Sequence, residues 1–549
     1  MTILGLDEDP HNWADDRTPP PDLHAANELA FSNAPETLEP ISLPVQGTLS
    51  PWLQGVLYRT GPGTYSVPSP KAKGGTVDIQ HWFDALGINH RFSISPKGVE
   101  YSARKSCLSA EEEIAREGKV PGITFGETDP CEKLFHKSFA AFRRTLGSGQ
   151  AAQTHKKPDG QNAQVTFSLD MPGFPRKKIP DRLVAREPKA GEGPKYLVAK
   201  TDASLLQLLD PDTLEPLALA IYRSVHPELT GELAAAHACT DFKGAYYNFV
   251  VNVGPRPVYK VFRISKDGEV KILAEVTDAP LAYIHSFAMT GRYVILCVWA
   301  SEITNYGLSV LYHGNLAQSI STTPTHPTTF YVIDRHSGGL VAKYTTPPFF
   351  CFHQLNAYDD PETEDVIIDL AAYPDASFIQ LLYVKELRQG LKEQFGKARR
   401  YRLSDPSKTS AATSATREAQ VEWTTDGSIE LPTVRPEVYH KPYRFAYTIT
   451  LTRNTLLFAD TIVKFDVSTS PPTAQHWYAA PGQTVGEALF VSRPGSTEED
   501  DGVLLTVVLD GVRRRSFLLV LDARTRGELA RAEAPEGKWL SAGFHGVFI

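Results

Sequence analysis

The sequence has few cysteines, no long apolar run and no strong excess of charge. Its five cysteines show no CxxC spacing, and an odd number in a chain of 549 residues does not suggest a disulfide framework. The longest apolar run, residues 294–300, is far too short to span a bilayer, and the acidic N-terminus lacks the basic and apolar regions of a secretory signal. We therefore expect reduced, mostly buried cysteines and a cytoplasmic protein.

Several common catalytic signatures are also missing. The chain contains no GxSxG elbow, P-loop, Rossmann glycine fingerprint or HExxH motif. The net charge of -8 is spread along the chain, which argues against a nucleic-acid partner. The apolar fraction of 42% and the charged fraction of 22% are typical of a globular protein with a large core.

What the sequence does contain is a series of short strand pairs, each around a turn with Asp and usually Gly. Four of them lie at residues 205–220, 261–270, 331–344 and 518–532. Asp and Gly supply the hydrogen bonds and positive φ angles of tight hairpins. Because the pairs recur at irregular intervals over most of the chain, they favour an all-β propeller with inserted loops over a sandwich, and they leave the number of blades open.

The remaining segments are predicted to decorate this sheet structure. Residues 1–40 are rich in Pro, Asp, Glu and Asn and should form an extended arm, with a single β-propeller domain over 41–549. Helical insertions are expected at about 108–146 and 376–396, and a mobile loop at about 405–420. The second insertion has amphipathic spacing, which fits either a helix that covers the blades or one that forms a membrane-surface or substrate-access helix.

Four histidines lie in similar strand-like contexts: His237, His285, His353 and His545. A lone buried histidine is usually a hydrogen-bonded polar residue rather than a metal ligand. A propeller, however, brings distant strand ends to one axis, where four imidazoles could share a metal. The aromatic-His-Gly cluster around His545 fits this idea, because chain ends normally fray unless something holds them. Imidazole suits Fe, Cu, Zn and Ni, and these residues do not choose among them.

Two glutamates are candidates for supporting such histidines. Metal-bound His normally donates its second ring N–H to a carboxylate or carbonyl. Glu430 and Glu487 lie in strand-like apolar runs, where a carboxylate is costly without a partner. On local sequence alone, exposed charges at a strand edge are an equally good interpretation.

Several motifs together resemble the carotenoid cleavage oxygenases, non-haem iron enzymes with a seven-bladed β-propeller. The resemblance runs from about residue 45 to the end, through Tyr-Arg-Thr-Gly-Pro-Gly at 58–63, His-Trp-Phe-Asp at 81–84, the four His contexts and Gly-Phe-His-Gly at 543–546. The stretch 122–131 is similar to the fungal branch that cleaves carotenoids. This family implies an all-β, seven-bladed propeller with helical insertions over its top face.

The resemblance implies roles for particular residues. His237, His285, His353 and His545 would bind Fe(2+), and Glu430 and Glu487 would orient them. The third orienting Glu of the family falls on Asp202, whose side chain is one methylene shorter. Either the backbone compensates for the difference in length, a water intervenes, or one histidine lacks this support. Thr201, Phe352 and Phe544 are expected to line the active site, and no separate acid or base is assigned.

The activity implied is iron-dependent cleavage of a conjugated C=C bond of a carotenoid or apocarotenoid with O2, which gives two carbonyl products. One alternative is the same cleavage of stilbenes or other alkenyl phenols, although the Lys and Tyr that would hold the phenol are replaced by Thr201 and Lys105. A second alternative is a non-catalytic isoprenoid-binding propeller. We expect no protein partner, and because polyenes reside in membranes, peripheral contact with a membrane or lipid droplet is a further hypothesis.

Overall fold

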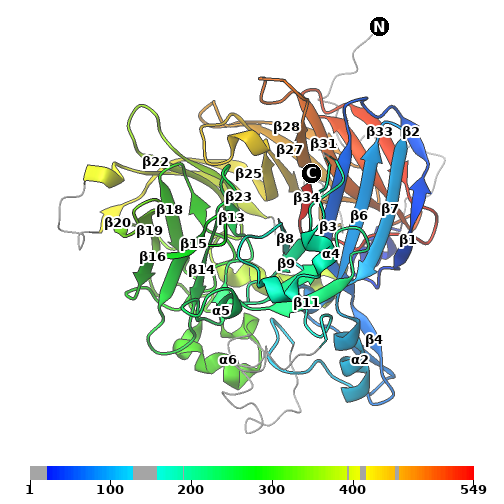
Figure 1. The fold of residues 1–549 in the computed structure, drawn as a ribbon, viewed down its shortest axis with the longest axis horizontal. Helices are drawn as coiled ribbons and strands as arrows, with labels where there is room; N and C mark the ends of the chain where they lie inside the picture. Colours follow the sequence, from blue (N-terminus) through cyan, green and yellow to red (C-terminus); the bar gives the residue numbers. More distant parts are fainter. Residues whose placement is uncertain (1–21, 128–156, 190, 392–394, 409–415, 452–456) are drawn as a thin grey trace.

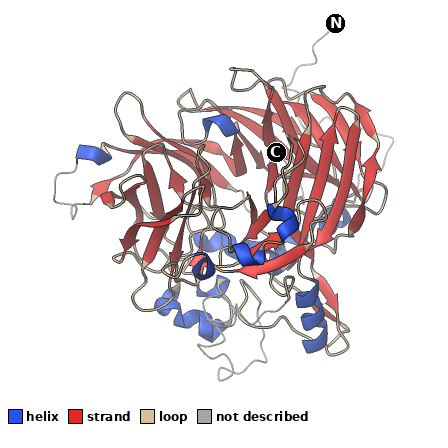
Figure 2. Cartoon of the chain, viewed as in Figure 1, coloured by secondary structure: helices blue, strands red, loops and turns tan. Residues whose placement is uncertain are grey.

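The computed structural model describes the chain except for residues 1–21, 128–156, 190, 392–394, 409–415 and 452–456. The described part is built mainly from β-sheets, and short helices lie between and beside them (Figure 2). Within it, no helix is long and apolar enough to cross a membrane. The predicted predominance of strands is thus confirmed.

Six large sheets make up most of the described part, and each consists mainly of consecutive antiparallel strands (Figure 1). A small two-stranded sheet of β4 (Ser66–Pro68) and β5 (Thr76–Asp78) is separate from them. The first large sheet has the order β1 (Thr37–Leu43), β7 (Gly98–Lys105), β6 (Leu86–Ser95), β3 (Gly55–Thr64), β34 (Gly546–Phe548).

The next three sheets follow one another along the chain. The second contains β8 (Thr166–Leu169), β9 (Leu197–Lys200), β10 (Leu206–Leu209) and β11 (Pro216–Ala220). The third contains β12 (Leu233–Ala234), β13 (Cys239–Thr240), β14 (Tyr246–Val251), β15 (Tyr259–Ile264) and β16 (Val270–Val276). The fourth contains β17 (Ala288–Met289), β18 (Tyr293–Val298), β19 (Thr328–Asp334), β20 (Leu340–Thr346) and β24 (Arg417–Glu418).

The fifth sheet has seven strands and divides at its longest one. It contains β21 (Gln354–Asp359), β22 (Val366–Ala372), β23 (Gly396–Leu403), β25 (Gln420–Val434), β26 (Phe445–Thr450), β27 (Thr461–Asp466) and β28 (Thr473–Tyr478). Residues 420–429 of β25 pair with β23, and residues 430–434 pair with β26 across an irregular register. β25 is therefore shared by two four-stranded halves, β21–β22–β23–β25 and β25–β26–β27–β28.

The sixth sheet and the first contain strands from both ends of the chain. The sixth is formed by β29 (Gln483–Val485), β30 (Leu489–Ser492), β31 (Gly502–Asp510), β32 (Arg515–Asp522), β33 (Glu528–Glu533) and the N-terminal β2 (Val45–Gly47). In the first sheet, C-terminal β34 pairs with β3 (Figure 1). This pairing explains why the chain end is ordered.

Burial differs between the strands of one sheet. Every residue of β14, β18 and β22 is buried, whereas β16 is buried only at Leu273 and Val276. A strand covered on both faces needs a continuous apolar run, and this accounts for the run at 294–300, most of which is β18. The four predicted hairpins are confirmed as β10–β11, β15–β16, β19–β20 and β32–β33.

The segments outside the sheets differ in part from expectation. Within the predicted arm, α1 (Leu23–Ala30) is a helix capped by the Asp22 side chain, and Leu29 and Ala30 are buried. α2 (Leu108–Glu117) begins the predicted insertion 108–146, whose residues from 128 on lie outside the described part. The predicted loop 405–420 is ordered at its ends as η7 (Pro406–Lys408) and β24, and residues 409–415 lie outside the described part.

The segment 376–396 is not one continuous helix. It forms the 3-10 helix η6 (Ala376–Leu382) and the short helix α7 (Val384–Arg388), and β23 begins at Gly396. The break falls at Tyr383, which has extended backbone and pairs with His81, while the N–H of Val384 donates to the carbonyl of Gln80. A tertiary contact thus takes the backbone groups that a continuous helix would use.

The other described helices are short. They are α4 (Asp181–Val184), α5 (Tyr222–Val225), α6 (Leu308–His313) and the 3-10 helices η1 (Trp82–Asp84), η3 (Arg176–Lys178), η4 (Thr304–Gly307), η5 (Ala317–Ser319) and η8 (Pro436–Val438).

Candidate metal centre

The four predicted histidines occupy equivalent places in four different sheets. His353 and His545 directly precede β21 and β34, and His237 and His285 lie two and three residues before β13 and β17. Each of these strands is at the edge of its sheet. Each of the four imidazoles therefore comes from the segment just before one of these four edge strands.

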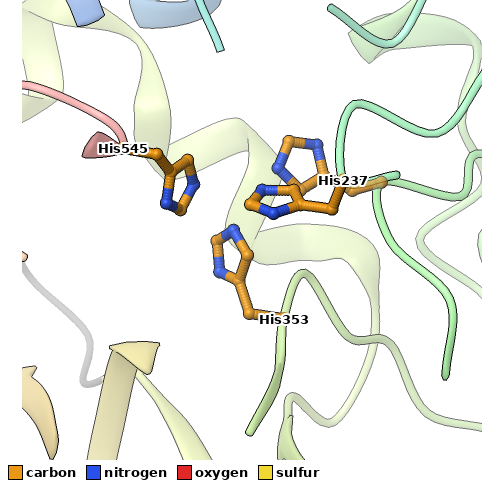
Figure 3. A group of neighbouring side chains, drawn as sticks. His237, His353 and His545 are labelled. Atoms are coloured by element: carbon orange, nitrogen blue, oxygen red, sulfur yellow. The ribbon is translucent and has the colours of Figure 1, made fainter. Parts of the chain in front are cut away.

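These imidazoles converge on one point. One ring nitrogen of each lies within 4.8 Å of those of the other three. Figure 3 shows the rings of His237, His353 and His545 directed toward one another. The ring centroids of His237 and His545 are 4.3 Å apart, and those of His285 and His353 are 5.1 Å apart. Residues far apart in the sequence thus form one compact cluster.

The electrostatics of the cluster suit a cation. Burial, followed by the neighbouring histidines, lowers the pKa of His237 well below its ordinary value, and burial lowers the pKa of His545 to about 4. Neutral rings keep a lone pair free for a metal. The Nε2 atoms of His237 and His353 are buried without a hydrogen-bond partner, a costly state that coordination would relieve. A set of four imidazoles fits a first-row divalent metal such as iron, cobalt or zinc.

Three of the histidines donate a hydrogen bond to a buried carboxylate. Nδ1 of His285 lies 2.8 Å from Asp202 Oδ1, Nδ1 of His353 lies 2.5 Å from Glu430 Oε2, and Nδ1 of His545 lies 2.8 Å from Glu487 Oε1. A carboxylate on Nδ1 fixes the tautomer that leaves Nε2 free, and it orients the ring. Among the described residues, no carboxylate is paired in this way with His237.

Asp202 reaches His285 directly despite its shorter side chain. The hydroxyl of Tyr283 donates to Asp202 Oδ2 at 3.0 Å and also lies 3.2 Å from His285 Nδ1. No bridging water is needed for this contact. Because Tyr283 bonds to Oδ2 and His285 bonds to Oδ1, both oxygens of the Asp202 carboxylate have a hydrogen-bond partner.

Glu430 and Glu487 are held ionised inside the protein. Burial alone would raise the pKa of Glu430, but His353, the Leu431 N–H and the Tyr373 hydroxyl together keep that pKa below its ordinary value. The pKa of Glu487 is likewise lowered, because His545 and Arg59 outweigh the effect of burial. The interpretation of both residues as exposed strand-edge charges is therefore wrong.

A cavity of about 500 Å³ opens beside the cluster. His285, His353 and His545 form part of its wall, and apolar side chains dominate the rest. The residues expected to line the site, Thr201, Phe352 and Phe544, all lie on this wall. A cavity of this volume with an apolar wall can hold an apolar molecule beside the histidine cluster.

Several wall and support residues were not assigned a role from the sequence. The Phe83 ring stacks toward His285 at 6.4 Å between centroids and packs edge-on against Phe544 at 5.5 Å. Phe83 lies in the His-Trp-Phe-Asp motif, so the signal was present without a role attached. Tyr283, Tyr373 and Arg59 contact carboxylates that are distant in the sequence, and nothing in their local sequence indicates this.

Fold and site together define a β-sheet protein with a buried, all-histidine site that can hold a metal ion at one wall of an apolar cavity. The family model described as RPE65, retinal pigment epithelial membrane protein, matches residues 30–549. The chain belongs to this family, the carotenoid oxygenases.

Named relatives cover nearly the whole chain. A carotenoid dioxygenase of Neurospora crassa is 32% identical and covers 95% of this chain and 91% of its own. A torulene dioxygenase of Fusarium fujikuroi is 34% identical, covering 95% and 93%. Cobalt-substituted Synechocystis ACO, an apocarotenoid oxygenase, superposes with a TM-score of 0.70 at 20% identity over 96% of this chain and 98% of that chain, which supports the fold.

Proposed function

We propose that this chain is an iron(II)-dependent dioxygenase that cleaves a conjugated C=C bond of a carotenoid or apocarotenoid. The observation that carries the proposal is the four-histidine cluster at the wall of an apolar cavity. The substrates in the names of the fungal relatives, carotenoid and torulene, support the class of substrate. One C=C bond and one O2 are consumed, and two carbonyl groups are formed.

The chain's own residues would position the reactants. Bound iron(II) would supply a site at which O2 is activated beside the double bond. His237, His285, His353 and His545 would hold the iron, and the carboxylates of Asp202, Glu430 and Glu487 would keep three of the rings in the tautomer that leaves Nε2 free.

The cavity wall would select the bond that is cleaved. Phe83, Phe352 and Phe544 exclude water and offer flat apolar contacts to a polyene, while Thr201 lies on the same wall. Because the double bonds of a polyene are nearly identical, the depth and shape of the cavity must set the register. No protein acid or base is required in this scheme.

A seven-bladed propeller is the architecture we propose for the sheets. The five undivided sheets and the two halves joined at β25 make seven groups of at least four strands in the described part. Sharing of the first and sixth sheets between the two chain ends is the closure such a ring needs. Residues of α2, α6 and η6 border the cavity, which supports helical insertions over one face.

A polyene is favoured over an alkenyl phenol because the chain offers no phenol clamp at the two expected positions. Lys105 is ion-paired with Glu111, its Nζ lying 2.9 Å from Oε2, and it does not line the cavity. Thr201 does line it, but its hydroxyl carries no charge to hold a phenolate. The phenol reaction therefore remains the alternative rather than the proposal.

Contact with a membrane surface is proposed at α6 rather than at 376–396. Phe378 and Leu382 of η6 are buried and line the cavity, so they do not form an exposed apolar surface. In contrast, Leu308 and Tyr312 of α6 are 59% and 65% exposed, while Val310 of the same helix lines the cavity. Flotation with liposomes should weaken when Leu308 and Tyr312 are both replaced by Ser, and unchanged flotation would contradict this assignment.

The test of the proposed function is a product assay with a panel of substrates. Iron-loaded protein is incubated with β-carotene, torulene, an apocarotenal, resveratrol and a vinyl phenol, and the products are identified by mass. Cleavage of a polyene to two carbonyl products supports the proposal. Turnover of the phenols alone would establish the alternative. Binding of polyenes with equal affinity in iron-loaded and iron-free protein, without turnover, would indicate a non-catalytic isoprenoid-binding protein.

A further inference from the structure

We propose that Arg59 is a positioning residue that acts through Glu487 to balance the charge of the metal site and so favours a divalent over a trivalent ion. This inference rests on the proposed function, since it concerns the same four-histidine centre. Arg59 lies in β3, far from the histidines in sequence, and contacts the site only through other residues.

The guanidinium of Arg59 is held by Glu487 and by the backbone near the C-terminus. Its Nη1 donates to the Glu487 backbone carbonyl at 3.1 Å and to Glu487 Oε2 at 3.2 Å, and its Nη2 donates to the Phe544 carbonyl at 3.3 Å. The side chain is buried, and a Cβ at Gly546 would approach its Cδ to 2.7 Å. A glycine is therefore required for the charged group to reach this position.

Glu487 differs from the other two carboxylates in having this cation. Asp202 is supported by the hydroxyl of Tyr283, and Glu430 by the hydroxyl of Tyr373 and a backbone N–H. Those donors are neutral. Among the described residues, Arg59 is the cation that forms an ion pair with one of the three carboxylates.

With Arg59 included, the formal charges of the metal site sum to zero. The four imidazoles are uncharged in this scheme, so a divalent cation and the three carboxylates leave one negative charge, which Arg59 cancels. Lys200 is also buried, but no ion pair joins it to these carboxylates in the described structure. An uncompensated charge is expensive in a dry interior, so a site without Arg59 should favour the trivalent ion.

The test compares variants that change this charge in opposite directions. Arg59→Met removes the positive charge, Glu487→Gln removes the negative one, the double variant removes both, and Arg59→Lys keeps the charge. Each protein is loaded with iron, its fold is checked by circular dichroism and its iron content is measured. The ratio of ferric to ferrous protein is then determined at fixed potentials by mediated redox titration.

The charge account predicts opposite signs. At a given potential the ferric-to-ferrous ratio should rise about tenfold or more in Arg59→Met, fall by a similar factor in Glu487→Gln, and return to within about threefold of wild type in the double variant and in Arg59→Lys. A purely structural role would move Arg59→Met and Glu487→Gln in the same direction, or would reduce iron content alike in the single and double variants.

Several results would overturn the inference. Equal ratios in Arg59→Met and wild type would do so. If Arg59→Met does not fold, the Glu487→Gln variant still tests the inference, because a rise or no change in its ferric fraction contradicts the charge balance. Failure of wild-type protein to bind iron would instead refute the proposed function, and this outcome is separate from a normal wild-type site with an unchanged Arg59→Met.

Discussion

Replacement of Glu430 by Gln tests how strongly a carboxylate outside the metal site controls metal binding. In the wild type, Oε2 accepts the N–H of His353 at 2.5 Å and the backbone N–H of Leu431 at 2.7 Å, and Oε1 accepts the Tyr373 hydroxyl at 2.8 Å. Gln has the same shape and can keep the first two bonds through its amide oxygen. Its amide nitrogen then faces Tyr373, which must accept instead of donate.

The cost follows from the lost charge. A hydrogen bond to a carboxylate is about twice as strong as a neutral one, so each retained bond weakens by roughly 1 kcal/mol. The neutral partner also makes the His353 ring a weaker base. Together these effects predict about 10- to 100-fold weaker metal binding, the range typical of such partners.

The measurement is a chelator-competition titration with Co(II), which avoids oxidation of iron. Glu422→Gln is the matched control, because Glu422 lies on the same strand but is exposed and pairs with Arg402. It should bind cobalt like the wild type. A Glu430→Gln protein that folds and binds cobalt within about threefold of wild type would refute the role assigned to Glu430.

Four other changes test the remaining parts of the account. His353→Ala should lose metal but stay folded, because hydrogen-bonded sheets and not the metal hold the core; full metal occupancy by elemental analysis would contradict the ligand assignment. Deleting the chain from His545 on should abolish metal binding and also lower the melting temperature, since β34 no longer pairs with β3; a truncated protein that keeps its metal would disprove this. Asp202→Glu should retain or raise cobalt affinity, as Tyr283 can still donate to the carboxylate, and a large loss would count against Asp202 as the partner of a ligand. Burial and Arg59 lower the pKa of His90 to about 3, so below pH 6.5 the unfolded chain binds a proton that the folded protein does not, and stability decreases as the pH is lowered. Relative to His90→Gln, the free energy of unfolding of wild-type apoprotein in urea should decrease by about 1.4 kcal/mol from pH 7.5 to pH 5.5. An equal pH dependence in both proteins would be inconsistent with a neutral buried His90.

Local sequence predicts the strands well because their signals are local. Apolar runs between turns that contain Asp and Gly identify the hairpins, such as β19–β20 around Asp334, whose carboxylate accepts backbone N–H groups of the turn. The continuous apolar run at 294–300 corresponds to β18, a strand whose residues are all buried. Neither signal reveals how the sheets are arranged around one another.

The site is less accessible from sequence because its contacts are distant. The resemblance to the carotenoid cleavage oxygenases identifies the four histidines, and the structure brings them together, whereas composition alone left the metal and the grouping open. Arg59 meets Glu487 across 428 positions, and Tyr283 meets Asp202 across 81. An arginine in a strand or a tyrosine in an apolar run gives no sign of such a partner.

The sequence predicts the helical segments poorly for a related reason. The pattern at 376–396 has helical spacing, but the pairing of Tyr383 with His81 divides it. Conversely, α1 is too short for its periodicity to stand out, and it is stabilised by the Asp22 cap and by burial of Leu29. A tertiary contact thus decides the break at Tyr383, whereas in α1 burial adds to a local cap.

The central claim is that the four-histidine site binds the iron that cleaves a polyene. The most direct test titrates iron(II) into metal-free protein and measures bound iron and cleavage products in the same samples, with β-carotene or torulene as substrate. The account predicts that product formation rises in proportion to bound iron and levels off at one iron per chain. Cleavage without iron, or full iron occupancy without cleavage of any polyene, would contradict it.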